Sequence, residues 1–236
     1  MSAAAGSALV GAMFWAKELW NYWKPRRVGI YGPSMVGKTT LDRYMTTPGE
    51  MEAIENRTDH KKILGRYIMP RPSRKRVGWK GEKRVIFSSD IGGEERFWNL
   101  WIDDMVSRQV EAVVFMFDHR AAEGGDSAIQ AIGGFKYLVD CVVKRQYRYR
   151  NFKSRRKGKK YRPLLIMLIA NKADQWWDEQ ANILWQQQRL GEHKIFDPFR
   201  EDLIRLQKSG IPTRRGMMAT KIGWNVEATM VDLLST

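Results

Sequence analysis

Residues 32–39 read Gly32-Pro33-Ser34-Met35-Val36-Gly37-Lys38-Thr39, and this segment is the strongest indication of the fold. It matches the phosphate-binding pattern G-x-x-x-x-G-K-[ST] and lies between a short apolar strand, 28–31, and a helix predicted near 38–45. In that order, backbone N–H groups and the start of the helix face the same phosphate oxygens. We expect Lys38 to reach the β- and γ-phosphates of a nucleotide and Thr39 to bind Mg²⁺. The residues expected to line the phosphates are Gly32, Ser34, Met35, Val36, Gly37, Lys38, Thr39 and Thr40.

Apolar strands and helical patterns alternate along the rest of the chain. Further strands are predicted over 63–69, 84–90, 112–118, 164–170 and 215–220, and further helices over 95–109, 126–143, 179–189, 198–208 and 225–234. This alternation predicts an α/β fold with a mostly parallel six-stranded sheet covered by helices on both faces. No second region carries a core of its own, so 25–236 is expected to form one domain after an N-terminal helix in 1–24.

The base of the nucleotide is indicated by Asn171-Lys172-Ala173-Asp174, which follows the strand predicted over 164–170. It matches the N-K-x-D signature of GTPases and lies at a strand end, where ligands bind in open α/β sheets. The Asp174 carboxylate can accept hydrogen bonds from N1–H and the 2-amino group of guanine, and adenine offers neither donor there. Lys172 can lie over the base, and Asn171 can tie the loops together. Ala219-Thr220-Lys221 resembles the S-A-K element whose backbone contacts the guanine oxygen, with Ala219 in place of serine.

Two further loops are expected to sense the γ-phosphate and Mg²⁺. Asp90 and Gly93 form a D-x-x-G pattern at the end of the strand predicted over 84–90. Asp90 is expected to hold Mg²⁺ through water, and the Gly93 N–H to bond the γ-phosphate. Thr58 is the residue we expect to cover Mg²⁺ from the other sensor, with Thr46 and Thr47 as alternatives.

The residues around Gly93 resemble the Ras superfamily of small GTPases, and most closely its Arf-like branch. The similar stretch is Asp90-Ile91-Gly92-Gly93-Glu94-Glu95-Arg96-Phe97-Trp98-Asn99-Leu100-Trp101. Its D-[IV]-G-G start, with Leu-Trp beginning seven residues after the second glycine, is similar to the Arf pattern, as is an apolar helix ahead of the P-loop strand. The resemblance covers about 8–234. It implies a Ras-like P-loop NTPase fold and a switch that binds GTP or GDP with Mg²⁺.

Three departures from that family qualify the expectation. Glu94 stands where the family has the glutamine that orients water, and a carboxylate beside the γ-phosphate predicts slow intrinsic hydrolysis. Ser2 replaces the glycine that is myristoylated. The 144–162 insertion is foreign to the family. The catalytic residues are expected to be Lys38, Gly93 and Glu94. An arginine finger is not assigned: Arg96 or Arg120 could supply it within the chain, or a partner protein could.

The N-terminal segment 8–23, ALVGAMFWAKELWNYW, predicts a helix with a wide apolar and aromatic face. Three interpretations stay open: the helix lies in a membrane interface, packs on its own domain, or docks into a partner protein. The family resemblance implies that this helix packs on its own domain when GDP is bound and is released when GTP is bound. We expect a cytoplasmic protein, for which the first interpretation adds a peripheral position on the cytoplasmic face of a membrane.

Net charge is +15, and much of it lies in 144–162, where eleven residues are Lys or Arg and none is acidic. This segment is predicted to be a solvated insertion outside the core. It can attract anionic lipid, or bind nucleic acid with Tyr147, Tyr149, Phe152 and Tyr161 stacking on bases, or simply be a solvated loop. A second basic cluster occupies 71–84.

The leading hypothesis is therefore a GTP/GDP switch that hydrolyses GTP slowly and works at a membrane or with a protein effector. A nucleic-acid-associated GTPase is the first alternative. The second is a module that GTP stabilises without being hydrolysed. Cys141 is the only cysteine, so no disulfide forms within the chain.

Overall fold

The computed structural model describes residues 26–46, 62–68, 85–144, 148–149 and 159–234. The predicted N-terminal helix, Thr58, Thr47 and the 71–84 cluster lie outside these ranges, as does most of the basic insertion.

Six strands of the described chain form one sheet in the order β2-β3-β1-β4-β7-β8. They are β1 (Arg26–Tyr31), β2 (Lys62–Ile68), β3 (Val85–Asp90), β4 (Ala112–Phe117), β7 (Leu165–Ala170) and β8 (Thr213–Met217). Only the β2–β3 pair is antiparallel, and the remaining neighbours run parallel. The predicted α/β class with a mostly parallel sheet is confirmed at this level.

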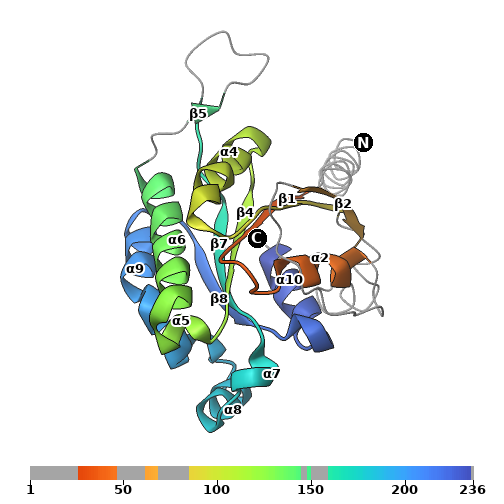
Figure 1. Ribbon diagram of the computed structural model, residues 1–236, viewed down its shortest axis with the longest axis vertical. Helices are drawn as coiled ribbons and strands as arrows, with labels where there is room; N and C mark the ends of the chain where they lie inside the picture. Colours follow the sequence, from red (N-terminus) through yellow and green to blue (C-terminus); the bar gives the residue numbers. More distant parts are fainter. Residues whose placement is uncertain (1–25, 47–61, 69–84, 145–147, 150–158, 235–236) are drawn as a thin grey trace, which may run out of the picture.

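Helices cover both faces of the sheet, as Figure 1 shows, with α2 and α10 on one side and α4, α6 and α9 on the other. Their bounds are α2 (Lys38–Thr46), α4 (Trp98–Arg108), α5 (Arg120–Glu123), α6 (Gly125–Val143), α7 (Ala173–Trp176), α8 (Glu179–Gln186), α9 (Arg200–Lys208) and α10 (Val226–Leu234). Short 3-10 turns occupy Glu95–Phe97 (η1), Leu190–Glu192 (η2), Lys194–Phe199 (η3) and Thr220–Ile222 (η4). Within the described ranges, no helix has the length and apolar character needed to cross a bilayer.

The central strands β4 and β7 are buried along their whole length. Because successive side chains of a strand point to opposite faces, each strand serves two cores. Phe115 and Phe117 pack with α4, α6 and α9, whereas Val114 and Met116 pack with α2 and α10. Continuous apolar runs are therefore what this doubly covered sheet requires.

Helix α4 is fixed to β1 by buried polar contacts. The Tyr31 hydroxyl donates to Asp104 Oδ2 at 2.8 Å, and Arg108 Nε donates to Asp104 Oδ1 at 2.8 Å. Burial, together with the neighbouring Asp104 carboxylate, raises the pKa of Tyr31 well above its usual value. The Asp104 carboxylate is fully buried but not isolated, since a cation and a hydroxyl both satisfy it.

Two short segments of the basic insertion pair as strands: β5 (Arg148–Tyr149) runs antiparallel to β6 (Lys159–Lys160). Tyr161, just after it, is wrongly placed by the sequence in a solvated loop. Its side chain is 5% exposed, and its hydroxyl donates to Val110 O at 3.0 Å. Tyr161 therefore belongs to the core and is not available to stack on a base.

The last strand also differs from its prediction over 215–220. It spans Thr213–Met217, and residues 218–220 belong to the loop that follows. β8 is an edge of the sheet, where polar residues such as Arg214 are tolerated, so the strand extends further toward the N-terminus than the prediction. The helix predicted over 95–109 is divided in a similar way, into η1 and α4.

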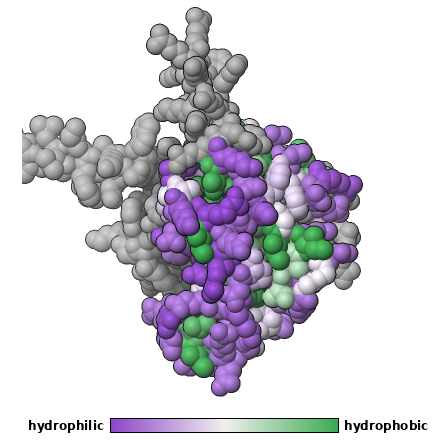
Figure 2. Space-filling model, turned by 90° about the vertical axis from the view of Figure 1, so that its left-hand side faces the viewer, coloured by the Kyte–Doolittle hydropathy of each residue, from purple (hydrophilic) through white to green (hydrophobic). Residues whose placement is uncertain are grey.

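Figure 2 looks onto the side of the molecule that carries α9 in Figure 1. Apolar residues appear there as separate patches among hydrophilic ones. Exposed apolar side chains such as Ile129 on α6 and Ile204 on α9 are ordinary when they stand singly.

Candidate nucleotide-binding site

Five loops leave the same edge of the sheet, at the carboxyl ends of β1, β3, β4, β7 and β8. The topology alone brings them together, because parallel strands that are neighbours end on one side. This edge carries every described stretch that the sequence singled out for nucleotide binding.

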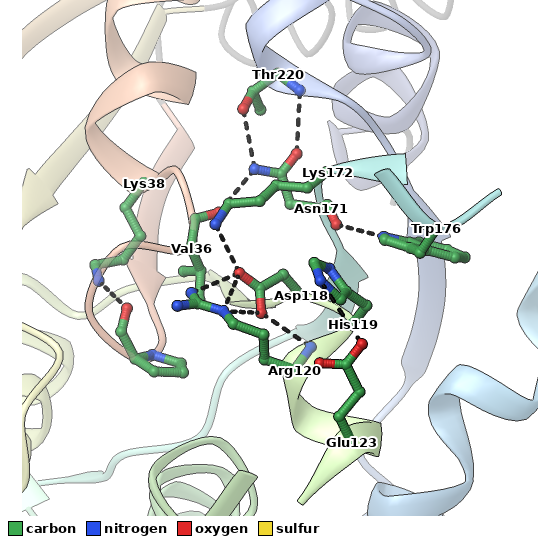
Figure 3. A network of polar contacts seen from close by, with 11 residues as sticks. Val36, Lys38, Asp118, His119, Arg120, Glu123, Asn171, Lys172, Trp176 and Thr220 are labelled. Carbon is green, nitrogen blue, oxygen red and sulfur yellow. Dashed lines mark hydrogen bonds and ion pairs between the residues drawn. The ribbon is translucent and has the colours of Figure 1, made fainter. Parts of the chain in front are cut away.

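Lys38 closes over the P-loop. Its side chain is 7% exposed, and Nζ donates to Gly32 O at 2.9 Å and to Pro33 O at 2.7 Å (Figure 3). A buried ammonium needs acceptors on most sides, and the loop's own carbonyls supply two. Lys38 is thus held at the mouth of the loop, where incoming phosphate oxygens can replace the carbonyls.

Gly37 marks the place where three loops touch. Its φ of +93° lies in the left-handed region, which favours glycine. A Cβ there would come 2.3 Å from Asn171 Nδ2 and 3.1 Å from Thr220 Oγ1. Only glycine therefore lets the P-loop approach the other two loops this closely.

Asn171 is the hub between these loops, as Figure 3 shows, and it is fully buried. Its Nδ2 donates to Val36 O at 2.7 Å and to Thr220 Oγ1 at 2.9 Å. Its Oδ1 accepts from the Thr220 N–H at 3.0 Å. One amide side chain thereby joins the P-loop, the N-K-x-D loop and the loop after β8.

Asp118, which no sequence motif indicated, directly follows the buried strand β4 beside this hub. It is 3% exposed and pairs with Lys172 Nζ at 2.8 Å and with Arg120 Nη2 at 2.6 Å. Burial alone would raise the pKa of Asp118, but the hydrogen bonds from Arg120 and Lys172 outweigh it and lower the pKa below its usual range. The only signal for Asp118 was its position at the end of an apolar strand next to β7.

The rest of the N-K-x-D loop leads from the buried hub to the surface. Lys172 has φ of +58°, which turns the chain sharply into α7. Asp174, in the first turn of α7, is exposed, so its carboxylate is accessible from solvent. Trp176 Nε1 donates to Asn171 O at 2.9 Å and fastens the end of α7 back onto the hub.

The loop after β8 has two of its three amides already engaged. Ala219 N–H donates to Trp224 O at 3.1 Å, and Thr220 N–H donates to Asn171 Oδ1. Ala219 and Thr220 are buried, whereas Lys221 is exposed at the start of η4, where N–H groups lack partners within the helix. The expected backbone contact to a base therefore falls to the Lys221 amide.

The D-x-x-G loop lies directly against the P-loop. A Cβ on Gly93 would come 2.1 Å from the Pro33 carbonyl carbon and 2.2 Å from Ser34 N, so this position has room only for glycine. Trp101 Nε1 donates to Gly92 O at 3.0 Å. Because the peptide between residues 92 and 93 is planar and trans, the Gly93 N–H points away from Trp101.

Glu94 does not stand alone beside that loop. Arg96 Nε lies 2.9 Å from Glu94 Oε2, and the Arg96 guanidinium also sits over the Phe97 ring, 4.7 Å from its centroid. Both candidate cis arginines are thus engaged by carboxylates, Arg96 by Glu94 and Arg120 by Asp118.

The residues expected to bind Mg²⁺ are partly placed. Thr39 begins α2 beside Lys38, and Asp90 ends β3, where its backbone pairs with Lys62. Thr58 lies outside the described residues. The described residues include no cluster of three or more His, Cys, Asp or Glu side chains.

The structure thus brings together Lys38, Gly93, Asn171, Lys172 and the loop after β8. The exposed P-loop residue Met35, with φ of +65°, and the partly buried Ser34, Thr39 and Thr40 complete that edge. Comparison with models of protein families and with curated proteins gave no match for this chain.

Proposed function

We propose that this protein is a small GTPase with a Ras-like P-loop fold, closest to the Arf-like type, that binds GTP or GDP with Mg²⁺. The observation that carries the proposal is the Asn171 hub, which joins a phosphate loop to two loops suited to reading guanine. A P-loop alone does not select a base, whereas this junction brings the N-K-x-D loop, which carries Asp174, against the P-loop.

Guanine recognition would combine two groups with opposite hydrogen-bonding character. The Asp174 carboxylate would accept from N1–H and the 2-amino group, and the Lys221 N–H would donate to the 6-oxo group. The stem of Lys172, whose ammonium is held by Asp118, would lie along the base. Adenine presents the reverse pattern at these positions and would leave both groups unpaired.

Phosphate recognition would use the P-loop amides and Lys38. Thr39 and Asp90 would hold Mg²⁺, with Thr58 as the expected third ligand, and Mg²⁺ would neutralise charge on the β- and γ-phosphates. The Gly93 N–H, which faces away from Trp101, would sense the γ-phosphate. The same groups would stabilise charge that develops when water attacks the γ-phosphate.

Hydrolysis is expected to be slow without an activator. Glu94 replaces a neutral water-orienting amide, and its carboxylate is engaged by Arg96. A water molecule would have to compete with that ion pair for Glu94. An activating partner that draws Arg96 away, or supplies an arginine, would relieve this restraint.

Partners and location follow as part of the same proposal: a protein effector, or an anionic membrane surface met by residues 8–23 and the basic loops on the cytoplasmic side. The basic insertion joins α6 to β7 at the end of the sheet away from the nucleotide loops, as β5 and α7 mark in Figure 1. A partner bound there would leave the nucleotide site open.

The test is a thermal-shift panel of GTP, GDP, ATP and ADP, each with Mg²⁺, followed by measurement of phosphate release. Ligand at a hundred times its dissociation constant should raise the unfolding midpoint by about 5–10 °C. We expect this shift for GTP and GDP and none for ATP and ADP. Equal shifts for the adenine nucleotides, or no shift for any nucleotide, would contradict the proposal.

A further inference from the structure

Three tryptophans pack against one another below the base-reading loops. The Trp177 and Trp224 rings meet edge-on with centroids 4.9 Å apart, and the Trp185 and Trp224 centroids are 5.2 Å apart. Trp177 and Trp185 complete the triangle at 6.3 Å. Trp177 follows α7 and Trp185 lies on α8, so two segments from the N-K-x-D side grip one residue from the other loop.

Trp224 is coupled to the loop after β8 through its backbone as well. Its N–H donates to Ala219 O and its carbonyl accepts from Ala219 N–H, both at 3.1 Å. This bridge closes the loop that contains Lys221. Fixing the ring of Trp224 therefore fixes one end of the segment that presents the Lys221 amide.

The cluster of Trp177, Trp185 and Trp224 is anchored to neighbouring elements. Asp178 caps α8 by accepting from Ala181 N–H at 2.8 Å, and it also binds His193 Nε2 at 3.0 Å and Lys194 Nζ at 2.9 Å. His193 Nδ1 accepts a hydrogen bond from the Ile195 N–H. The ring proton is therefore on Nε2, which donates a hydrogen bond to Asp178. Trp185 thus stands on a capped helix that is tied to η3, and Trp177 directly precedes the capping residue Asp178.

The loop has supports on its other sides too. Thr220 is held by Asn171, and the ring of Tyr44 on α2 lies against Gly223. Lys221 stands between these supports and is itself exposed. A loop backbone held from three directions is preorganised for a ligand, because the ligand need not order it.

We infer that Trp224, clamped by Trp177 and Trp185, is a positioning residue that sets the Lys221 N–H for the 6-oxo group of guanine. The inference rests on the proposed function and adds this chain's own device to it. Trp185 is 43% exposed, so the cluster buries less apolar surface than a core tryptophan would, and replacing its members should leave the fold intact.

The experiment compares three nucleoside diphosphates by calorimetry on the full chain: GDP, IDP, which keeps the 6-oxo group and N1–H but lacks the 2-amino group, and 2-aminopurine riboside diphosphate, which keeps the 2-amino group but lacks the 6-oxo group and N1–H. The variants are W224L and W224F. W98L is the matched control, since Trp98 packs on α4 and α6 away from this cluster. Unfolding midpoints without nucleotide are recorded for each.

We expect W224L to weaken GDP and IDP alike, by about tenfold, the worth of one hydrogen bond. Binding of the 2-aminopurine nucleotide should stay unchanged, W224F should be intermediate, and W98L should match the wild type. Equal loss for all three ligands, or no loss for any, would overturn the inference. If W224L fails to fold, W224F and W185L are judged instead, by whether binding of GDP and IDP weakens while binding of the 2-aminopurine nucleotide stays unchanged. A wild type that binds no guanine nucleotide would instead refute the proposed function.

Discussion

The two halves of the site are built differently. On the base side, a buried asparagine, a buried ion-pair cluster and three tryptophans hold the loops to one another. On the γ-phosphate side, the D-x-x-G loop rests on the P-loop through a glycine contact and is held by one indole hydrogen bond. The first half is a fixed frame, and the second has a single described side-chain tether.

This contrast suits the proposed switch. The guanine base would not change when GTP is hydrolysed, so the residues proposed to read it would gain from rigidity. The γ-phosphate would be present before hydrolysis and absent after it, so the loop proposed to sense it would need to move at low cost. The predictions below test that division, beginning with the largest expected effect.

Asn171→Ala should be the most damaging change in the rigid half. It leaves Val36 O and the Thr220 N–H without their buried partner, which should lower the free energy of unfolding by about 2–4 kcal/mol. The affinity for GDP should fall by about a hundredfold or more, because the loops separate. Urea titration and calorimetry measure the two effects, with the exposed Asn182→Ala on α8 as control. Unchanged GDP binding in Asn171→Ala would show that the hub is not needed.

Trp101→Phe should affect the mobile half alone. It keeps the buried ring but removes the N–H that holds Gly92 O, so the orientation of the Gly93 N–H is no longer enforced. A non-hydrolysable GTP analogue should bind about tenfold more weakly while GDP is unaffected. The control is Trp98→Phe, because Trp98 Nε1 has no hydrogen-bond partner among the described residues. Equal losses for both nucleotides would remove the distinction between the halves.

Glu94→Gln should speed hydrolysis. A neutral amide releases Arg96 and can orient water without repelling the γ-phosphate, so single-turnover GTP hydrolysis should rise by about fivefold. Arg96→Ala serves as the companion variant, because it frees the carboxylate without neutralising it. A wild type faster than Glu94→Gln would mean that the carboxylate itself takes part in catalysis.

Asp118 should give the smallest effect, as a pH dependence of stability. Its folded-state pKa lies below the unfolded value near 3.9, so its contribution is present above that pH and is lost as pH falls through the folded pKa. The free energy of unfolding of the wild type should therefore exceed that of Asp118→Asn by about 1 kcal/mol at pH 6, and this difference should shrink toward pH 3. Asp126→Asn, an exposed carboxylate on α6, is the control. A gap that stays constant with pH would exclude this role for Asp118.

The sequence predicted those parts of the site that short motifs encode. Strand, turn and helix around Lys38, and the strand end before Asn171, follow from spacing and apolar runs, so the sheet and its ligand edge could be anticipated. Asp118 and Trp224 could not, because their roles depend on which strands and loops become neighbours. The same limit explains Tyr161: at the end of a run of charges it resembled a loop residue, and only its contact with Val110 O places it in the core.

The loop after β8 illustrates a second limit. The pattern around Lys221 predicted a backbone contact, but it could not say which amide was free to make it. Hydrogen bonds to Trp224 and Asn171 use the first two, and these partners lie in a different turn and on a different strand end. Which backbone N–H groups of the loop are already paired is therefore decided by tertiary contacts, which the local sequence does not reveal.

Base choice by Asp174 tests the account most directly. Xanthine carries an oxygen where guanine carries the 2-amino group, so the wild type should bind GDP far more tightly than XDP. In Asp174→Asn, the side-chain amide can donate to that oxygen, and calorimetry should find the preference reversed in favour of XDP. A GDP-to-XDP affinity ratio that is the same in both proteins would show that Asp174 does not read the base and that these loops do not share one guanine nucleotide.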